Sequence, residues 1–196
     1  MALELTTAPT KTPVSLAEAK GHCRVTDTVF DARILSLIQA ATARVERITG
    51  ARLCAQTVTL TLDKFPSWDL DLGVYPVRSV TSVKHDDTAN VEQTLTLDTG
   101  GSPQGDYFTN LTGMYPKISP RVAWPATYYK KPASVRIVLE VGYTKLSDIP
   151  ADLKHAVLVC VKEMFDIGGE SVAFDDLTPA MNTVKALTDM HRRMPV

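Results

Sequence analysis

The sequence predicts an α+β protein, with helices towards both ends of the chain and a β region between them. Apolar residues recur at helical spacing between residues 30 and 48 and again between residues 153 and 165. Between these stretches the apolar period changes to two, and turn-forming clusters separate the alternating segments. A chain of 196 residues can bury one substantial core, or one core with a small insertion.

Two helices are predicted in the first 50 residues, after an N-terminal tail. Ser15 and Glu18 have the spacing of a capping box, so the first helix is expected to begin at Ser15. Thr28 and Asp31, three residues apart, mark the start of the second helix, and Gly50 ends it because glycine readily takes a positive φ. Its apolar stripe consists of Phe30, Ile34, Leu37, Ile38, Ala41, Val45 and Ile48.

Strand patterns then follow in four places. They cover residues 57–63, 79–84, 92–98 and 134–141. The clusters at residues 65–67, 85–87, 100–103 and 131–132 are typical of turns. Together they predict a small antiparallel sheet or sandwich between about residues 55 and 143.

Helical spacing returns after Pro150, which is tolerated in the first turn of a helix. Gly168-Gly169 is expected to end this helix, whose stripe is Leu153, Ala156, Val157, Cys160, Met164 and Phe165. Residues Thr183–Arg193 can form a short helix with Val184, Leu187 and Met190 on one side. Because this segment follows an acidic spacer, we expect a mobile arm that becomes ordered on a partner. The alternative is an ordinary helix packed on its own domain.

The sequence offers little for catalysis or for a metal. No P-loop, nucleophile elbow or zinc-protease motif is present, so we expect no enzyme activity and no cofactor. An enzyme with an unrecognised site is the rival hypothesis. The three cysteines are far apart in apolar surroundings and lack zinc-ligand spacing, which predicts buried free thiols. His85-Asp86-Asp87 could suggest acid–base chemistry, but its place between two strands predicts solvated turn residues.

Two features of the sequence bear on the compartment in which the protein is made. The start of the chain has no apolar segment of signal-peptide length, and nowhere do about 18 apolar residues run together. We therefore expect a soluble protein made in the cytoplasm, without a membrane partner.

Charge is balanced over the whole chain, with 21 Lys and Arg against 22 Asp and Glu, but uneven within the β region. The charged residues of the stretch 63–106 are mostly acidic, whereas residues 107–139 hold no acidic residue. The basic residues of the second stretch are Lys117, Arg121, Lys130, Lys131 and Arg136, and Tyr115, Trp124, Tyr128 and Tyr129 lie among them. Three interpretations stay open. In the first, residues 115–136 form the binding surface of a monomeric β-containing module that binds nucleic acid. In the second, the aromatic rings pack in the core or in turns, and the charged side chains are solvated. In the third, the acidic and basic halves of the β region meet across neighbouring subunits of a ring.

The order of these segments resembles the head–tail connector (adaptor) proteins of long-tailed phages and gene transfer agents. The similar stretches cover most of residues 12–168, and their ordered combination carries the resemblance. They are residues 13–20, 31–50, 56–60, 75–83, 135–143 and 149–156.

The resemblance implies a non-enzymatic, structural virion protein built as a small helical bundle with an inserted β region. Residues 1–54 would hold a tail and two helices, residues 55–143 the antiparallel β insertion, residues 144–169 the third helix of the bundle, and residues 170–196 a C-terminal arm. Copies would form a twelve-fold ring below the portal protein, linking the DNA-filled head to the tail.

The resemblance also implies partners and a location. The partners would be other copies, the portal protein, a head-closure (stopper) or tail-completion protein, and the DNA that passes through the channel. The protein would be assembled in the bacterial cytoplasm and would lie at the head–tail interface of a virion or virus-like particle. The expected portal contacts are Val184, Lys185, Leu187, Met190, Arg192 and Arg193. The expected ring-contact or DNA-facing residues are Lys117, Arg121, Lys130, Lys131 and Arg136.

Overall fold

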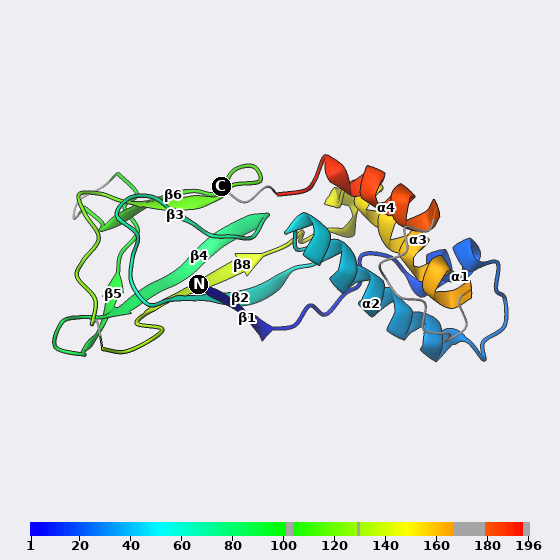
Figure 1. The fold of residues 1–196 in the computed structure, drawn as a ribbon, viewed down its shortest axis with the longest axis horizontal. Coiled ribbons are helices and arrows are strands. Elements are labelled where there is room, and N and C mark those ends of the chain that lie inside the picture. The colour runs from blue at the N-terminus through cyan, green and yellow to red at the C-terminus, as the bar shows by residue number, and fades with distance from the viewer. Residues whose placement is uncertain (101–103, 129, 167–178, 194–196) are drawn as a thin grey trace. The chain divides into compact units, whose positions relative to one another are not determined.

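The structure is a computed structural model that describes residues 1–100, 104–128, 130–166 and 179–193. The chain divides into two compact units, one that holds the strands and one that holds the helices (Figure 1). This confirms the predicted α+β class. Met1–Thr10 and Ala55–Gly142 form the first, which we call the β unit. Lys11–Cys54 and Tyr143–Val196 form the second, which we call the helical unit.

The β unit consists of two antiparallel sheets that share one apolar core. Its strands are β1 (Ala2–Thr7), β2 (Gln56–Leu62), β3 (Leu70–Asp71), β4 (Val77–Asp86), β5 (Glu92–Leu95), β6 (Tyr107–Asn110), β7 (Lys117–Pro120) and β8 (Val135–Val141). The larger sheet has the order β1-β2-β8-β4-β5, and the smaller has the order β3-β7-β6. Leu60, Ile137 and Leu139 from the larger sheet and Tyr107 and Ile118 from the smaller one are buried in the same cluster. This is the arrangement of a sandwich.

The prediction of an N-terminal tail is wrong for the first residues of the chain, because they form the edge strand β1. Leu3 lies opposite Leu60 and Leu5 opposite Val58 of β2, and the side chain of Leu3 packs against the core. The alternation of leucine with polar residues in ALELTT is the physical reason, since it gives the segment one apolar side. Strands β3, β6 and β7 were also not predicted; they are two to four residues long.

The helical unit contains four helices within the described residues, where the sequence predicted a bundle of three and an arm. They are α1 (Leu16–Cys23), α2 (Asp31–Thr49), α3 (Ala151–Asp166) and α4 (Pro179–Asp189), with a short 3₁₀ turn at Leu146–Asp148. The predicted capping box is confirmed: the Glu18 N–H donates to Ser15 Oγ (3.2 Å), and the Ser15 N–H donates to Glu18 Oε2 (2.6 Å). Gly50 ends α2 as predicted, with φ +75°.

Helices α2 and α3 supply much of the apolar core of the helical unit. On α2, the predicted stripe is buried at Ile34, Ile38, Ala41 and Val45, whereas Phe30 remains 37% exposed. On α3, the buried residues are Leu153, Ala156, Val157, Cys160 and Val161. Cys23, Cys54 and Cys160 are buried free thiols, as predicted. Desolvation raises the pKa of Cys54 and of Cys160 to about 11, so both stay protonated at neutral pH.

The interpretation of Thr183–Arg193 as a mobile arm is wrong, because α4 packs against α3 and α2. Val184 and Thr188 are fully buried, and the Arg193 N–H donates to the Thr49 carbonyl (2.9 Å). Burial of one apolar side of an amphipathic helix accounts for this, so the alternative of an ordinary packed helix holds. Gly168-Gly169 and the acidic spacer at Asp175 and Asp176 lie outside the described residues.

Candidate interaction surfaces

The end of strand β4 carries a buried carboxylate. His85 and Asp86 were predicted as solvated turn residues, and this is wrong: they are 3% and 2% exposed. The reason is that β4 continues through both residues, with His85 opposite Gln93 and Asp86 opposite Glu92 of β5. The ring of Phe65 packs edge-on against that of His85, with 5.8 Å between centroids.

Asp86 is held by two cations of the predicted ring-contact or DNA-facing set. Arg136 donates to both of its oxygens, from Nη2 to Oδ1 at 2.8 Å and from Nη1 to Oδ2 at 3.1 Å, and Lys131 Nζ lies 2.7 Å from Oδ2. Arg136 also contacts Glu92 (2.9 Å), which pairs with Lys84 (2.7 Å). The hydrogen bonds from Arg136 and Lys131 hold the pKa of Asp86 well below its ordinary value, and the bond to Asp86 raises the pKa of Arg136.

Other cations of the same set also meet acidic partners inside the chain. Arg121 Nε lies 3.5 Å from Asp98 Oδ2, and Lys117 pairs with Asp69. Lys130 is exposed in the segment before β8. The acidic and basic halves of the β region thus meet within one copy, because strand pairing brings Arg136 beside Lys84 and β5 beside β4. Contacts of these residues with DNA or with a neighbouring subunit stay a prediction.

Of the aromatic residues among these cations, Trp124 serves in packing. Trp124 stacks on Phe65, with 4.5 Å between ring centroids and 4° between planes, and its Nε1 donates to the Trp68 carbonyl (2.6 Å). Tyr128 donates its backbone N–H to the Asp86 carbonyl (2.9 Å). Tyr115 is 41% exposed, and Tyr129 lies outside the described residues. Phe65 covers one face of the Trp124 ring, so at most its other face is available to stack on a base.

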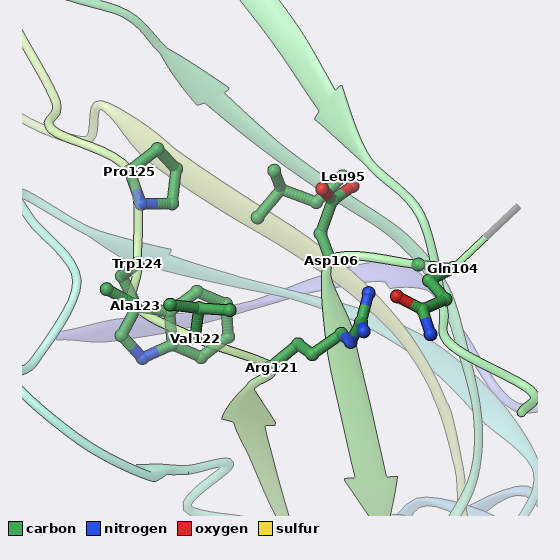
Figure 2. Close-up of a pocket in the computed structure, with 9 residues that line it drawn as sticks. Leu95, Gln104, Asp106, Arg121, Val122, Ala123, Trp124 and Pro125 are labelled. Carbon is green, nitrogen blue, oxygen red and sulfur yellow. The ribbon is translucent and has the colours of Figure 1, made fainter.

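A cavity of about 340 Å³ lies beside Trp124, where Figure 2 shows Leu95, Asp106 and Arg121 around it. Its charged groups are engaged in structural contacts: the Asp106 carboxylate accepts from the N–H (2.7 Å) and the hydroxyl (2.9 Å) of Thr96, and Arg121 pairs with Asp98. Gly105 in its wall is packed so tightly that an added Cβ would lie 2.4 Å from the Asp98 nitrogen. The cavity therefore offers no convergent reactive groups.

The packing of α4 buries some of the predicted portal-contact residues and leaves others exposed. Val184 is buried in the helical unit, and Leu187 and Arg193 are half-buried. Lys185, Met190 and Arg192 are exposed. If this segment binds a partner as packed here, these three are the predicted contact residues that remain exposed to it.

The described part of the chain shows neither a metal-ion cluster nor a helix suited to a membrane. It contains no group of three or more His, Cys, Asp or Glu side chains placed to hold a metal ion. Among its helices, none has the length and apolar character needed to cross a membrane.

Comparison with known proteins gave matches among solved structures alone. No protein-family model and no curated protein matches the sequence. Three similar chains come from the neck of an empty gene transfer agent (GTA) particle computed with C6 symmetry, the neck of a native GTA particle computed with C12 symmetry, and the virion of a native GTA particle. Their TM-scores are 0.78, 0.75 and 0.75; each is 24% identical, and each match covers 100% of this chain and 97% of the other. The chain therefore shares its entire fold, both units included, with a component of a GTA particle.

Proposed function

We propose that this chain is a structural protein of the neck of a tailed, phage-like particle, where copies of it form a ring. The observation that carries the proposal is the shared fold over the full length with a chain of a GTA neck. Those necks were computed with C6 and C12 symmetry, which supports a homo-oligomeric ring; we propose twelve copies, the number that C12 symmetry favours.

Within the neck, we propose the role of head–tail adaptor below the portal. The support is the ordered resemblance of residues 12–168 to the connector family, which agrees with the two-unit fold. The partners are then the portal protein, a stopper or tail-completion protein, and the DNA in the channel. The location is the head–tail interface of the virion.

The charged groups that could suggest acid–base chemistry are engaged in contacts within the chain. The buried carboxylate Asp86 is neutralised by Arg136 and Lys131, and the cavity beside Trp124 holds no uncommitted acid or base. The same ion pairs weaken the alternative of a nucleic-acid-binding module, since cations paired within the chain contribute less to phosphate binding.

Mass measurement of the purified chain, alone and mixed with purified portal protein, tests the proposal. We expect a complex with a mass of twelve copies on one portal. A chain that stays monomeric and does not bind the portal contradicts the proposal. Filter binding to single-stranded DNA, with a steep salt dependence and no portal binding, would favour the nucleic-acid module instead.

The exposed residues of α4 allow a sharper version of the same experiment. Lys185→Glu reverses an exposed charge on α4, and Lys145→Glu makes the matched change in the exposed segment before α3. If α4 contacts the portal, Lys185→Glu weakens portal binding and Lys145→Glu does not. Equal binding by both variants would remove Lys185 from the contact.

A further inference from the structure

Two histidines meet where α1 packs against α3 (Figure 1). His22 on α1 is half-buried, and His155 on α3 is exposed. Their rings pack edge to face, with 5.8 Å between centroids and 89° between planes. Neither ring forms a hydrogen bond or an ion pair with another described residue. Such a contact suits two neutral imidazoles, because protonation of both would place two positive charges side by side.

Helix α3 presents further positive charge to His22. Lys162 faces it along with His155, and Lys162 is itself paired with Asp166 (2.7 Å). Lys154, another cation of α3, faces the first turn of α1. Burial of His22, followed by the charges of His155 and Lys162, holds the pKa of His22 below its ordinary value of 6.5. All three causes act against a proton on His22.

The acidic side chains that α1 and α2 bring to this region are engaged with other partners. Asp31 of α2 pairs with Lys20 of α1 (2.6 Å). Glu18 of α1 accepts from the N–H (2.6 Å) and from the hydroxyl (2.7 Å) of Ser15. No described carboxylate forms an ion pair with His22. A proton on His22 would therefore bring a charge into the contact between α1 and α3 without a counter-ion.

The apolar anchoring of α1 is weak. Among its eight residues the buried ones are Ala19 and Cys23, and both side chains are small. On α3, by contrast, the buried residues include a leucine and two valines. Because the free energy of burial grows with the apolar area removed from water, α1 is held less firmly than α3. Weakly held elements can open locally while the rest of a protein stays folded, so one charge at this contact can decide whether α1 stays packed.

We propose that His22 and His155 form a pH-sensitive contact, which keeps α1 packed on α3 in neutral solution and releases α1 in mildly acidic solution. Release exposes His22 to water and removes it from Lys162. The imidazole can then carry a proton without repulsion from α3. The contact lies within one copy of the chain, so the proposal does not depend on the ring of the proposed function.

The direction of the pH dependence follows from the two states of His22. In the released helix its pKa has the ordinary value of 6.5, and in the packed helix its pKa is lower. The released state therefore binds more protons as the pH falls below 6.5, whereas above that pH the packing of α1 is fully favoured. Each unit of difference between the two pKa values weakens the packing by at most about tenfold.

Amide hydrogen exchange of the full-length chain tests the release of α1. The protection factors of the Leu16–Cys23 amides are expected to fall when the pH is lowered from about 7.5 to about 5.5, whereas those of α2 stay constant. His22→Phe keeps an aromatic ring that cannot be protonated, so protection in α1 should then be the same at both pH values. Protection that stays constant in the wild type, or that falls equally in His22→Phe, overturns the proposal.

His191→Gln is the matched control, because it removes another histidine of the same unit. His191 Nε2 lies 3.7 Å from Asp152 Oδ2, so this histidine has an acidic neighbour where His22 has none. The loss of protection in α1 at the lower pH should be as large in His191→Gln as in the wild type. If His191→Gln abolished that loss, or if α2 lost protection together with α1, the change would not be a local effect of His22, and the proposal would be overturned.

Proton NMR titration of the imidazole rings follows His22 directly, and it does not require a variant at His22. In the wild type the titration midpoint of His22 is expected below 6.5, the ordinary pKa of histidine. His155→Gln removes one of the two charges that oppose protonation, so the midpoint of His22 should move up towards that value. His191→Gln should leave the midpoint unchanged. A wild-type midpoint at or above the ordinary value, or one that His155→Gln does not move, contradicts the proposed contact.

Discussion

The helical unit and the β unit bury different kinds of residue. In the helical unit, the described buried polar residues are Thr49 and Thr188, and each hydroxyl donates to a carbonyl four residues earlier in its own helix. In the β unit they include Asp86, whose partners Lys131 and Arg136 lie about 45 to 50 residues further along the chain. The helical unit therefore depends on apolar packing, and the β unit depends in addition on a buried ion pair that acid can remove.

The two units can be followed separately in solution. Trp68 and Trp124, the two tryptophans of the chain, both belong to the β unit, so tryptophan fluorescence reports on that unit. The described helices of more than one turn all belong to the helical unit, so circular dichroism at 222 nm reports mainly on that one.

The largest expected effect is on the packing of the helical unit. Ile38 is fully buried on α2, so Ile38→Ala is expected to lower the free energy of unfolding by about 3 to 4 kcal/mol. Urea unfolding followed at 222 nm should show the loss, while the fluorescence transition stays near that of the wild type. Leu35→Ala is the control on the same helix, since Leu35 is 44% exposed. An equal shift in both signals would show that the two units unfold as one.

The second prediction concerns acid and the β unit. The pKa of Asp86 in the folded chain lies below its ordinary value of 3.8, so the carboxylate contributes stability above that pH and loses it as the pH falls towards the folded pKa. Asp86→Asn is therefore expected to lower the fluorescence-detected midpoint of urea unfolding at pH 7. The difference from the wild type should shrink below about pH 4.

Glu4→Gln is the control for Asp86→Asn, because it removes a carboxylate from an exposed position of the same unit. Its midpoint should follow the wild type at every pH. A gap between Asp86→Asn and the wild type that stays constant down to pH 3 would mean that the ion pair is not the source of the effect.

The sequence was sufficient where the deciding contact is local. Ser15 and Glu18 are three residues apart, and Gly50 ends a helix by its own conformational freedom, so both could be predicted. Asp86 could not, because its partner Arg136 is 50 residues away, and a His-Asp-Asp run between two strands is typical of a turn. The amphipathic pattern of α4 was visible, but no pattern within it indicates whether its apolar side meets its own chain or another protein.

The same limit applies to the candidate surfaces. The cations from Lys117 to Arg136 were recognised as a group, but contacts between segments far apart in the sequence decide that Asp86, Asp69 and Asp98 pair with four of them. The edge strand β1 was missed because six alternating residues at the start of a chain resemble a tail as much as a strand. Pairing with β2 distinguishes a strand from a tail, and that pairing joins residues 50 or more positions apart.

A third prediction compares one glycine from each unit. Gly105→Ala in the β unit would place a Cβ within 2.6 Å of backbone atoms of Leu97 and Asp98, and backbone cannot move aside easily. We expect a loss of about 1 to 3 kcal/mol in the fluorescence transition. Gly21→Ala in α1 meets nothing within 4 Å and should stabilise the helical unit by about 0.5 to 1 kcal/mol, seen at 222 nm. The same sign for both variants would contradict the close packing at Gly105.

The last prediction concerns the N-cap at the start of α1. Ser15→Ala removes the hydroxyl that accepts from the Glu18 N–H, and the loss of such a cap costs about 1 kcal/mol. Ser15→Asp should restore most of this, because a carboxylate can accept the same bond and is favoured at a helix N-terminus. Ser147→Ala is the control, since that exposed hydroxyl bonds to the side chain of Asp148 and caps no helix. All three are measured by urea unfolding at 222 nm and pH 7. If Ser15→Ala instead shifted the fluorescence transition of the β unit by the same amount, the separation of the two units on which these comparisons depend would be wrong.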